Sequence, residues 1–106
     1  MSSELGSFID AARPEFEAKL QEWVEIPTIS AESEHHADIE RMADSAVQYL
    51  RSLGASADKF ETPGNPVVFG RFEAGPKYPT VTIYNHLDVQ PANEPQWTRP
   101  AFVFGN

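Results

Sequence analysis

The sequence contains no cysteine among its 106 residues. A disulfide framework and a thiolate metal site are therefore both excluded. Any metal ion that these residues bind must take histidine and carboxylate ligands. No apolar stretch approaches the length of about 20 residues that a membrane-spanning helix needs. Residues 1–20 are acidic and amphipathic and lack the basic and apolar regions of a signal peptide, so we expect a cytoplasmic protein.

Basic residues are scarce: there are 8, against 16 acidic residues, and the formal net charge is −8. A chain of this charge is a poor match for nucleic acid or for an anionic membrane surface, so we expect neither partner. Most of the acidic residues lie at or before Glu61, in the half that reads as helical. Solvated helix faces explain this excess more simply than an acidic binding patch does.

The first half of the chain has helical periodicity. Apolar residues recur every three to four positions from Leu5 to Val24, interrupted by Pro14, which predicts either a kink or a restarted helix. Pro27 should close this helix, because the residue before a proline is driven out of the helical region. A second amphipathic helix is predicted from about His36 to Leu53, with Gly54 as its left-handed terminating residue.

Beyond Gly54 the pattern changes to short strands separated by proline- and glycine-rich turns. The class is therefore α/β, and we predict two N-terminal helices packed on a small mixed β-sheet. The last predicted strand runs into Gly105, which reads as the start of a hairpin turn, so we expect 1–106 to be an incomplete fragment of one domain. The predicted strands are 57–62, 66–72, 80–85 (the strongest) and 102–104, with a long loop over 90–100.

The segment Tyr84-Asn85-His86-Leu87-Asp88-Val89-Gln90-Pro91 is the most informative in the chain. It follows a β-branched run, so His86 and Asp88 fall at the C-terminal end of a predicted strand. Residues i and i+2 of an extended chain point to the same side. An imidazole and a carboxylate are thus presented together, as suits a metal-binding histidine whose ring is oriented by a carboxylate. The triplet alone is weak, because a capped strand end would look the same.

The other histidines, His35 and His36, precede the second helix close to Asp38. Adjacent histidines do not share a helix face and make a poor chelate. We interpret them as exposed residues at the helix start, with Asp38 and the 32–34 stretch complementing the positive end of the helix dipole. Ser30 and Ser33 are interpreted as turn residues.

Several motifs occur in a fixed order: Val-Glu-Ile-Pro-Thr-Ile-Ser at 24–30, Leu-Arg-Ser-Leu-Gly at 50–54, the His-Leu-Asp segment, and Trp-Thr-Arg-Pro-Ala-Phe at 97–102. This series resembles the start of the catalytic domain of the di-zinc metallopeptidases of family M-twenty. That family includes carnosinase-like dipeptidases, carboxypeptidase G, aminoacylase and succinyl-diaminopimelate desuccinylase. The resemblance spans about residues 8–104, and the His-Leu-Asp-Val-Gln-Pro wording is most similar to the dipeptidase and carnosinase branch.

The resemblance implies a role for each motif residue. His86 matches the family's first zinc ligand, and Asp88 matches the catalytic-site carboxylate that orients it. It also implies two zinc ions, with cobalt or manganese as alternative metals, and hydrolysis of an amide bond in dipeptides or N-acyl amino acids by a full-length parent. A homodimer is implied for that parent, because the family's inserted lid domain commonly forms its dimer interface.

The remaining family ligands and the glutamate general base have no match in these residues. A catalytic zinc ordinarily has three protein ligands, and this sequence supplies one good candidate. Residues 1–106 are therefore interpreted as the N-terminal portion of one metallopeptidase catalytic domain, inactive alone. The alternative is a non-catalytic fragment or interaction module that self-associates through open sheet edges.

Overall fold

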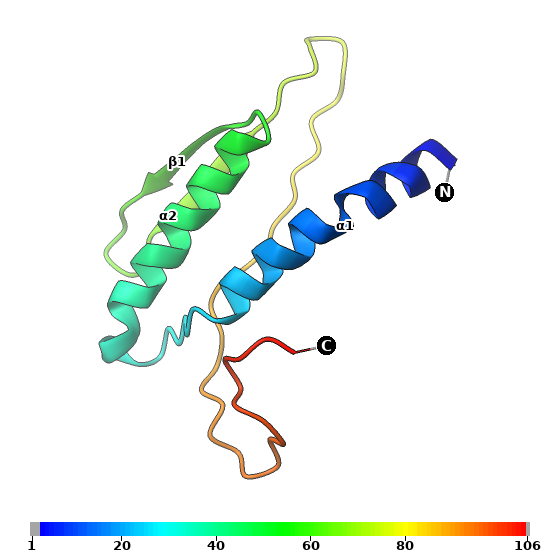
Figure 1. The fold of residues 1–106 in the computed structure, drawn as a ribbon. Coiled ribbons are helices and arrows are strands. Elements are labelled where there is room, and N and C mark those ends of the chain that lie inside the picture. Colours follow the sequence, from blue (N-terminus) through cyan, green and yellow to red (C-terminus); the bar gives the residue numbers. More distant parts are fainter. Residues whose placement is uncertain (1–2, 106) are drawn as a thin grey trace. The chain divides into compact units, whose positions relative to one another are not determined.

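The computed structural model describes residues 3–105, which contain two α-helices, one 3₁₀ turn and one β-hairpin (Figure 1). The elements are α1 (Ser3–Val24), η1 (Ser33–His35), α2 (His36–Ser52), β1 (Ser56–Phe60) and β2 (Val67–Arg71). The chain forms two compact units, residues 27–91 and residues 1–26 with 92–106. Within residues 3–105, no helix combines the length and the apolar character needed to cross a membrane.

Helix α1 runs through Pro14 without a break, so the restarted helix is wrong. None of its described residues is buried, and its apolar positions Leu5, Phe8 and Leu20 stay about half or more exposed. Two polar pairs on its surface follow the three-to-four residue spacing, Lys19 with Glu22 at 2.8 Å and Arg13 with Glu17 at 3.7 Å.

Helix α2 confirms the prediction from its sequence almost to the residue. Its apolar face is buried against the hairpin, because Ile39, Met42, Ala43, Ala46 and Val47 lie on one side of the helix. Gly54 has φ +97° and ends the helix as predicted. The N–H of Ala55 bonds the carbonyl of Leu50, and the N–H of Gly54 bonds that of Arg51, each at 3.0 Å, which is the Schellman arrangement.

Strands β1 and β2 pair antiparallel, with Ala57 opposite Gly70 and Phe60 opposite Val67. The inner face packs on α2, where Ala57 is buried. Gly70 has no side chain, which leaves room for the side chain of Leu50. A single parallel bridge joins Ile29 to Val89 elsewhere in the same unit. The predicted α/β class with two N-terminal helices and a small sheet is confirmed, but the sheet among the described residues is a two-stranded antiparallel one and is not mixed.

An ion-pair cluster fastens β1 to α2. The ammonium of Lys59 lies 2.6 Å from Glu40 and 2.8 Å from Asp44, both on the helix. The hydrogen bond to Asp44, followed by that to Glu40, raises the pKa of Lys59 above its usual range. Lys59 is therefore charged at neutral pH, and the inner face of the hairpin accommodates a lysine because its charge is compensated.

Two predicted strands are wrong. Residues 80–85 form no strand (Figure 1). Val81 and Ile83 are each 79% exposed, whereas the sequence predicts a buried strand. Residues 102–104 form a turn and bend. A strand needs backbone hydrogen bonds from a neighbour, and neither segment finds such a partner among the described residues. The loop predicted over 90–100 is confirmed as turns and irregular chain.

Candidate metal-binding site

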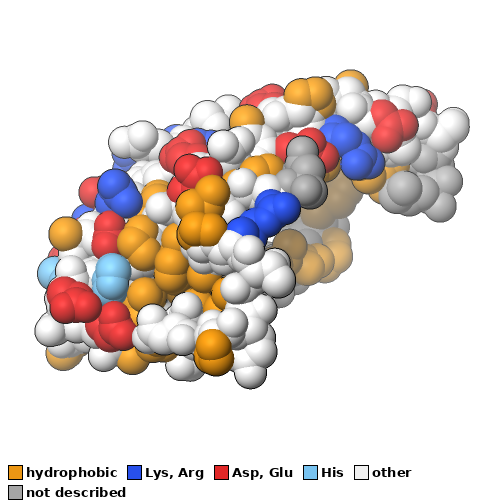
Figure 2. Space-filling view, turned by 60° about the horizontal axis from the view of Figure 1, so that its bottom comes forward, with side chains coloured by type: hydrophobic (Ala, Val, Ile, Leu, Met, Phe, Trp, Pro, Cys, Tyr) orange, Lys and Arg blue, Asp and Glu red, His pale blue; other side chains and the backbone are white. Residues whose placement is uncertain are grey.

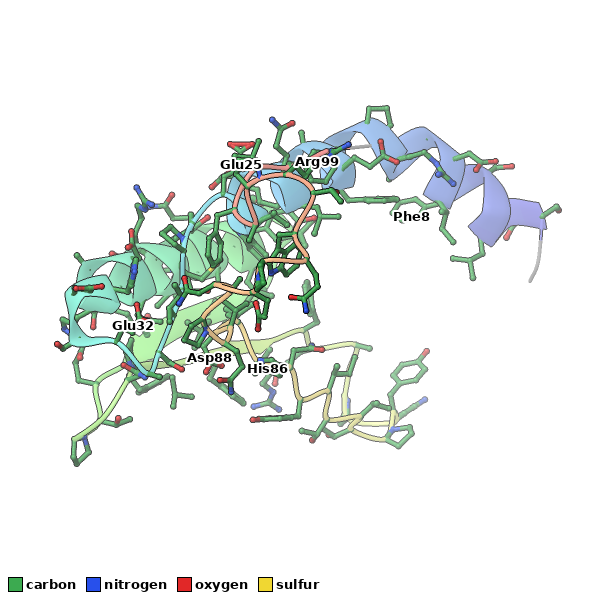
Figure 3. The ribbon with its side chains drawn as sticks, turned by 90° about the horizontal axis from the view of Figure 1, so that it is seen from below. Phe8, Glu25, Glu32, His86, Asp88 and Arg99 are labelled. Atoms are coloured by element: carbon green, nitrogen blue, oxygen red, sulfur yellow. The ribbon has the colours of Figure 1, made fainter. Side chains whose placement is uncertain are left out.

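The structure brings the two predicted site residues together. One ring nitrogen of His86, Nδ1, lies 3.3 Å from Oδ1 of Asp88 and 2.9 Å from the backbone carbonyl oxygen of the same residue (Figure 3). The His86 side chain is 72% exposed and that of Asp88 is 48% exposed. The pair therefore sits on an open surface of its unit, in an extended segment instead of at the end of a regular strand.

The surroundings of Nδ1 determine the tautomer of His86. A backbone carbonyl can only accept a hydrogen bond, so Nδ1 must carry a proton and donate to the Asp88 carbonyl, with the Asp88 carboxylate beside it. The other ring nitrogen, Nε2, is then left with its lone pair, and it has no hydrogen-bond partner among residues 3–105. A neutral imidazole with an acceptor at one nitrogen and a free lone pair at the other is the form that binds a metal ion. The residues present could therefore supply one ligand, Nε2 of His86, to a divalent metal ion.

A second chain segment holds Asp88. The hydroxyl of Ser30 donates a 2.6 Å hydrogen bond to Oδ2 of Asp88, so each carboxylate oxygen has its own neighbour. This bond lowers the pKa of the Asp88 carboxyl below its usual value; the backbone N–H of Asp88 and the nearby His86 act in the same direction, and burial opposes them. The carboxylate is therefore charged near neutral pH.

The residues around Ser30 pair with the motif segment. The N–H of Val89 donates to the carbonyl of Thr28 at 2.9 Å, and the Thr28 hydroxyl donates to the carbonyl of Leu87 at 2.8 Å. Thr28 is only 2% exposed and Ile29 only 6% exposed, so this contact is a fixed part of the unit. Sequence reasoning placed Ser30 in a turn, which is correct, but missed its bond to Asp88. No local signal marks a contact across 58 residues.

The second histidine cluster lies before α2. Ligand atoms of Glu32, Glu34 and His35 all lie within 4.8 Å of one another, and histidine and acidic side chains adjoin on the face shown in Figure 2. The interpretation of His35 as an exposed residue is wrong, because its side chain is 22% exposed. Its Nδ1 lies 2.9 Å from Asp38 and its Nε2 lies 3.5 Å from Glu32, so carboxylates occupy both ring nitrogens.

His36 belongs to neither arrangement. Its side chain is 65% exposed, and it is absent from the cluster that brings Glu32, Glu34 and His35 together. The two adjacent histidines thus point to different surroundings, as expected for neighbours on a helix.

The chain is 34% identical to a Cys-Gly metallodipeptidase of Schizosaccharomyces pombe, over 94% of this chain and 23% of the relative. It is 33% identical to a Beta-Ala-His dipeptidase of Rattus norvegicus, over 86% of this chain and 21% of the relative. The chain thus spans less than a quarter of the length of these curated relatives. No model of a known protein family matches the chain.

The fold comparison agrees with the sequence comparison. The solved structure of the dipeptidase Dug1p from Saccharomyces cerevisiae superposes with a TM-score of 0.82 at 28% sequence identity. The match covers 90% of this chain and 22% of that protein. A similar arrangement of elements therefore occurs within a solved dipeptidase structure.

Proposed function

Because the chain belongs to the carnosinase-like dipeptidases of metallopeptidase family M-twenty, we propose that residues 1–106 are the N-terminal portion of the catalytic domain of a metal-dependent dipeptidase. The whole protein would hydrolyse the amide bond of dipeptides, with N-acyl amino acids as the related substrate class. The observation that carries this proposal is the His86–Asp88 pair, in which a carboxylate and a carbonyl hold Nδ1 and leave Nε2 for a metal.

The roles of the two residues follow from their chemistry. His86 would donate the Nε2 lone pair to a metal ion. We propose that this metal is zinc and that the whole protein holds two such ions, with cobalt or manganese as alternative metals. Asp88 would keep the proton on Nδ1 and stabilise the orientation of the ring. A divalent ion held there would supply Lewis-acid polarisation of the scissile carbonyl and a bound water molecule of lowered pKa. In this proposal His86 binds the metal ion and Asp88 orients the imidazole ring. The general base is not assigned to any of residues 1–106.

Residues 1–106 alone should be inactive. A catalytic zinc site ordinarily needs three protein ligands and an open position, and the His86 site offers one ligand. A direct test is to incubate the purified 106-residue chain with zinc and each of two dipeptides, Cys-Gly and β-Ala-His, and to measure free amino acid. No release above the metal-only blank is expected. Turnover at a rate typical of enzymes, about 1 s⁻¹ or faster, would show that the site is complete without further segments.

A second candidate function is self-association of this chain. The outer face of the hairpin carries Phe60, Val67 and Phe69, which are 51%, 52% and 59% exposed, and residues 80–85 offer an unpaired extended backbone. Exposed apolar strands with free backbone groups invite pairing between chains. Sedimentation velocity from about 5 to 500 µM distinguishes the two outcomes. A size that rises with concentration supports self-association, whereas a constant monomer excludes it over that range.

A further inference from the structure

We propose that Ser30 is a positioning residue of the metal site, holding the Asp88 carboxylate so that it fixes the ring of His86. The inference rests on the proposed function, since it concerns the same metal ligand. It adds a residue from a distant segment to a site that the motif confines to residues 86–88. Its basis is the 2.6 Å hydrogen bond from the Ser30 hydroxyl to Oδ2 of Asp88.

The two oxygens of Asp88 are divided between two partners. Oδ2 accepts a hydrogen bond from the Ser30 hydroxyl, and Oδ1 remains on the side of His86, 3.3 Å from Nδ1. A carboxylate that is 48% exposed would otherwise rotate about its Cβ–Cγ bond and exchange its partner for water. A bond to a charged acceptor is stronger than one between neutral groups, so the Ser30 bond is suited to restrain this rotation.

The position of Ser30 is itself fixed by its neighbours. Ile29 makes the parallel bridge to Val89, and Thr28 bonds the motif segment through both its carbonyl and its hydroxyl. Thr28 and Ile29 are buried, in contrast to the open surface around His86. The buried residues Thr28 and Ile29 thus hold the Ser30 hydroxyl next to the exposed Asp88 carboxylate. In this way a residue outside the ligand set can orient a metal ligand at the surface.

A structural role in the turn does not account for this bond. A turn serine ordinarily bonds backbone groups within a few residues of its own position. The Ser30 hydroxyl instead reaches a side chain 58 residues away, and the backbone contact between the two segments is already made by Thr28 and Val89. Removing the Ser30 hydroxyl should therefore leave the pairing of the segments intact and release only the carboxylate.

The expected effect is modest and specific. Loss of a residue that directly orients a metal ligand typically costs about 10- to 100-fold in metal affinity. Ser30 acts one bond further out, through Asp88, so the loss should fall near the lower end, at about tenfold. The fraction of His86 carrying its proton on Nδ1 should fall only in part, because the Asp88 backbone carbonyl still accepts a hydrogen bond from that nitrogen when the carboxylate moves away.

The test uses the ¹⁵N-labelled 106-residue chain and zinc ions as the probe. Long-range ¹H–¹⁵N correlation spectra of the His86 ring report its tautomer without metal, and their shifts during a zinc titration give a dissociation constant for this site alone. Signals of His35 separate any binding at the Glu32–Glu34–His35 cluster. The variants are Ser30→Ala, Ser30→Thr (which keeps a hydroxyl), Ser33→Ala (an exposed serine as matched control) and His86→Ala.

The inference predicts that Ser30→Ala lowers the Nδ1–H fraction and weakens zinc binding at His86 about tenfold, with unchanged backbone amide signals away from the site. Ser30→Thr and Ser33→Ala should behave as the unmodified chain. Unchanged tautomer and affinity in Ser30→Ala, while the His86 site binds zinc, would overturn this inference alone. If zinc shifts no His86 signal, or His86→Ala leaves total zinc binding unchanged, the proposed metal ligand fails and the positioning role fails with it.

Discussion

The hydroxyl of Ser30 and the carboxylate of Asp88 are 2.6 Å apart, although 58 residues separate them in the sequence. The candidate site is therefore built from two segments, one carrying the histidine and the carboxylate and one holding that carboxylate. The parallel pairing of Ile29 with Val89 brings the two segments together. The stability of this pairing and the geometry of the site are for that reason linked.

Thr28 should matter more for stability than any other hydroxyl near the site. Thr28→Val keeps the shape but removes the donor to the Leu87 carbonyl, from a side chain that is 2% exposed. A loss of about 1–3 kcal/mol in the free energy of unfolding is expected, because the carbonyl loses its partner. Urea unfolding followed by circular dichroism measures it. Thr28→Ser retains the hydroxyl and loses only a methyl group, so a loss as large as that of Thr28→Val would show that packing, and not the hydrogen bond, is responsible.

Gly54 should be sensitive to any side chain that resists positive φ. Its φ of +97° is a conformation that residues with a Cβ atom rarely adopt, although the space around it is open. Gly54→Ala should therefore destabilise the protein by about 1–2 kcal/mol through backbone strain alone. Gly54→Asn is the matched variant, because asparagine tolerates the left-handed region, and it should lose less. Equal losses in thermal or urea unfolding would contradict this account of the helix terminus.

The pH response of Glu94 is predicted from one contact. The indole N–H of Trp97 donates a 3.0 Å hydrogen bond to the Glu94 carboxylate, which lowers the pKa of that group below its ordinary value of 4.5. A carboxyl whose folded-state pKa is lowered stabilises the fold above the ordinary pKa and loses that contribution as the pH falls through the folded-state value. The loss should therefore occur on the acid side of 4.5.

Carboxyl ¹³C shifts of Glu94 followed from pH 7 to pH 2 measure this directly. Trp97→Phe should move the midpoint back up toward the ordinary value, because the ring remains and the donor is lost. Tryptophan fluorescence in a Trp23→Phe background should change over the same interval as the Glu94 titration. A Glu94 midpoint that is the same with and without the Trp97 donor would rule out the contact as its cause.

The helices and the hairpin could be predicted from the sequence because their signals are local. The apolar face of α2 and the glycine at its end lie within one segment, and the turn cluster 63–65 marks the boundary between β1 and β2. Residues 80–85 show the limit of such signals. Their β-branched composition predicts a strand, but a strand also needs a partner, and none of the described residues pairs with this segment.

The local part of the site could be predicted from the sequence, whereas its long-range contacts could not. His86 and Asp88 are two residues apart, so their proximity follows from an extended backbone. The contacts of Ser30 and Thr28 depend on how distant segments pair, which no local pattern encodes. His35 was misjudged for a related reason: the carboxylates that enclose it come from both sides, Glu32 in the preceding loop and Asp38 on α2.

The central claim is that His86 is a metal ligand of a dipeptidase, and one measurement tests it most directly. The polypeptide encoded by the whole reading frame that contains residues 1–106 is purified, loaded with zinc and assayed for hydrolysis of β-Ala-His and Cys-Gly, with His86→Ala and His36→Ala side by side. We predict metal-dependent hydrolysis that falls at least about 100-fold in His86→Ala and is unchanged in His36→Ala. Hydrolysis that persists at full rate in His86→Ala, or that is absent from a fully metal-loaded and folded protein, would contradict the account.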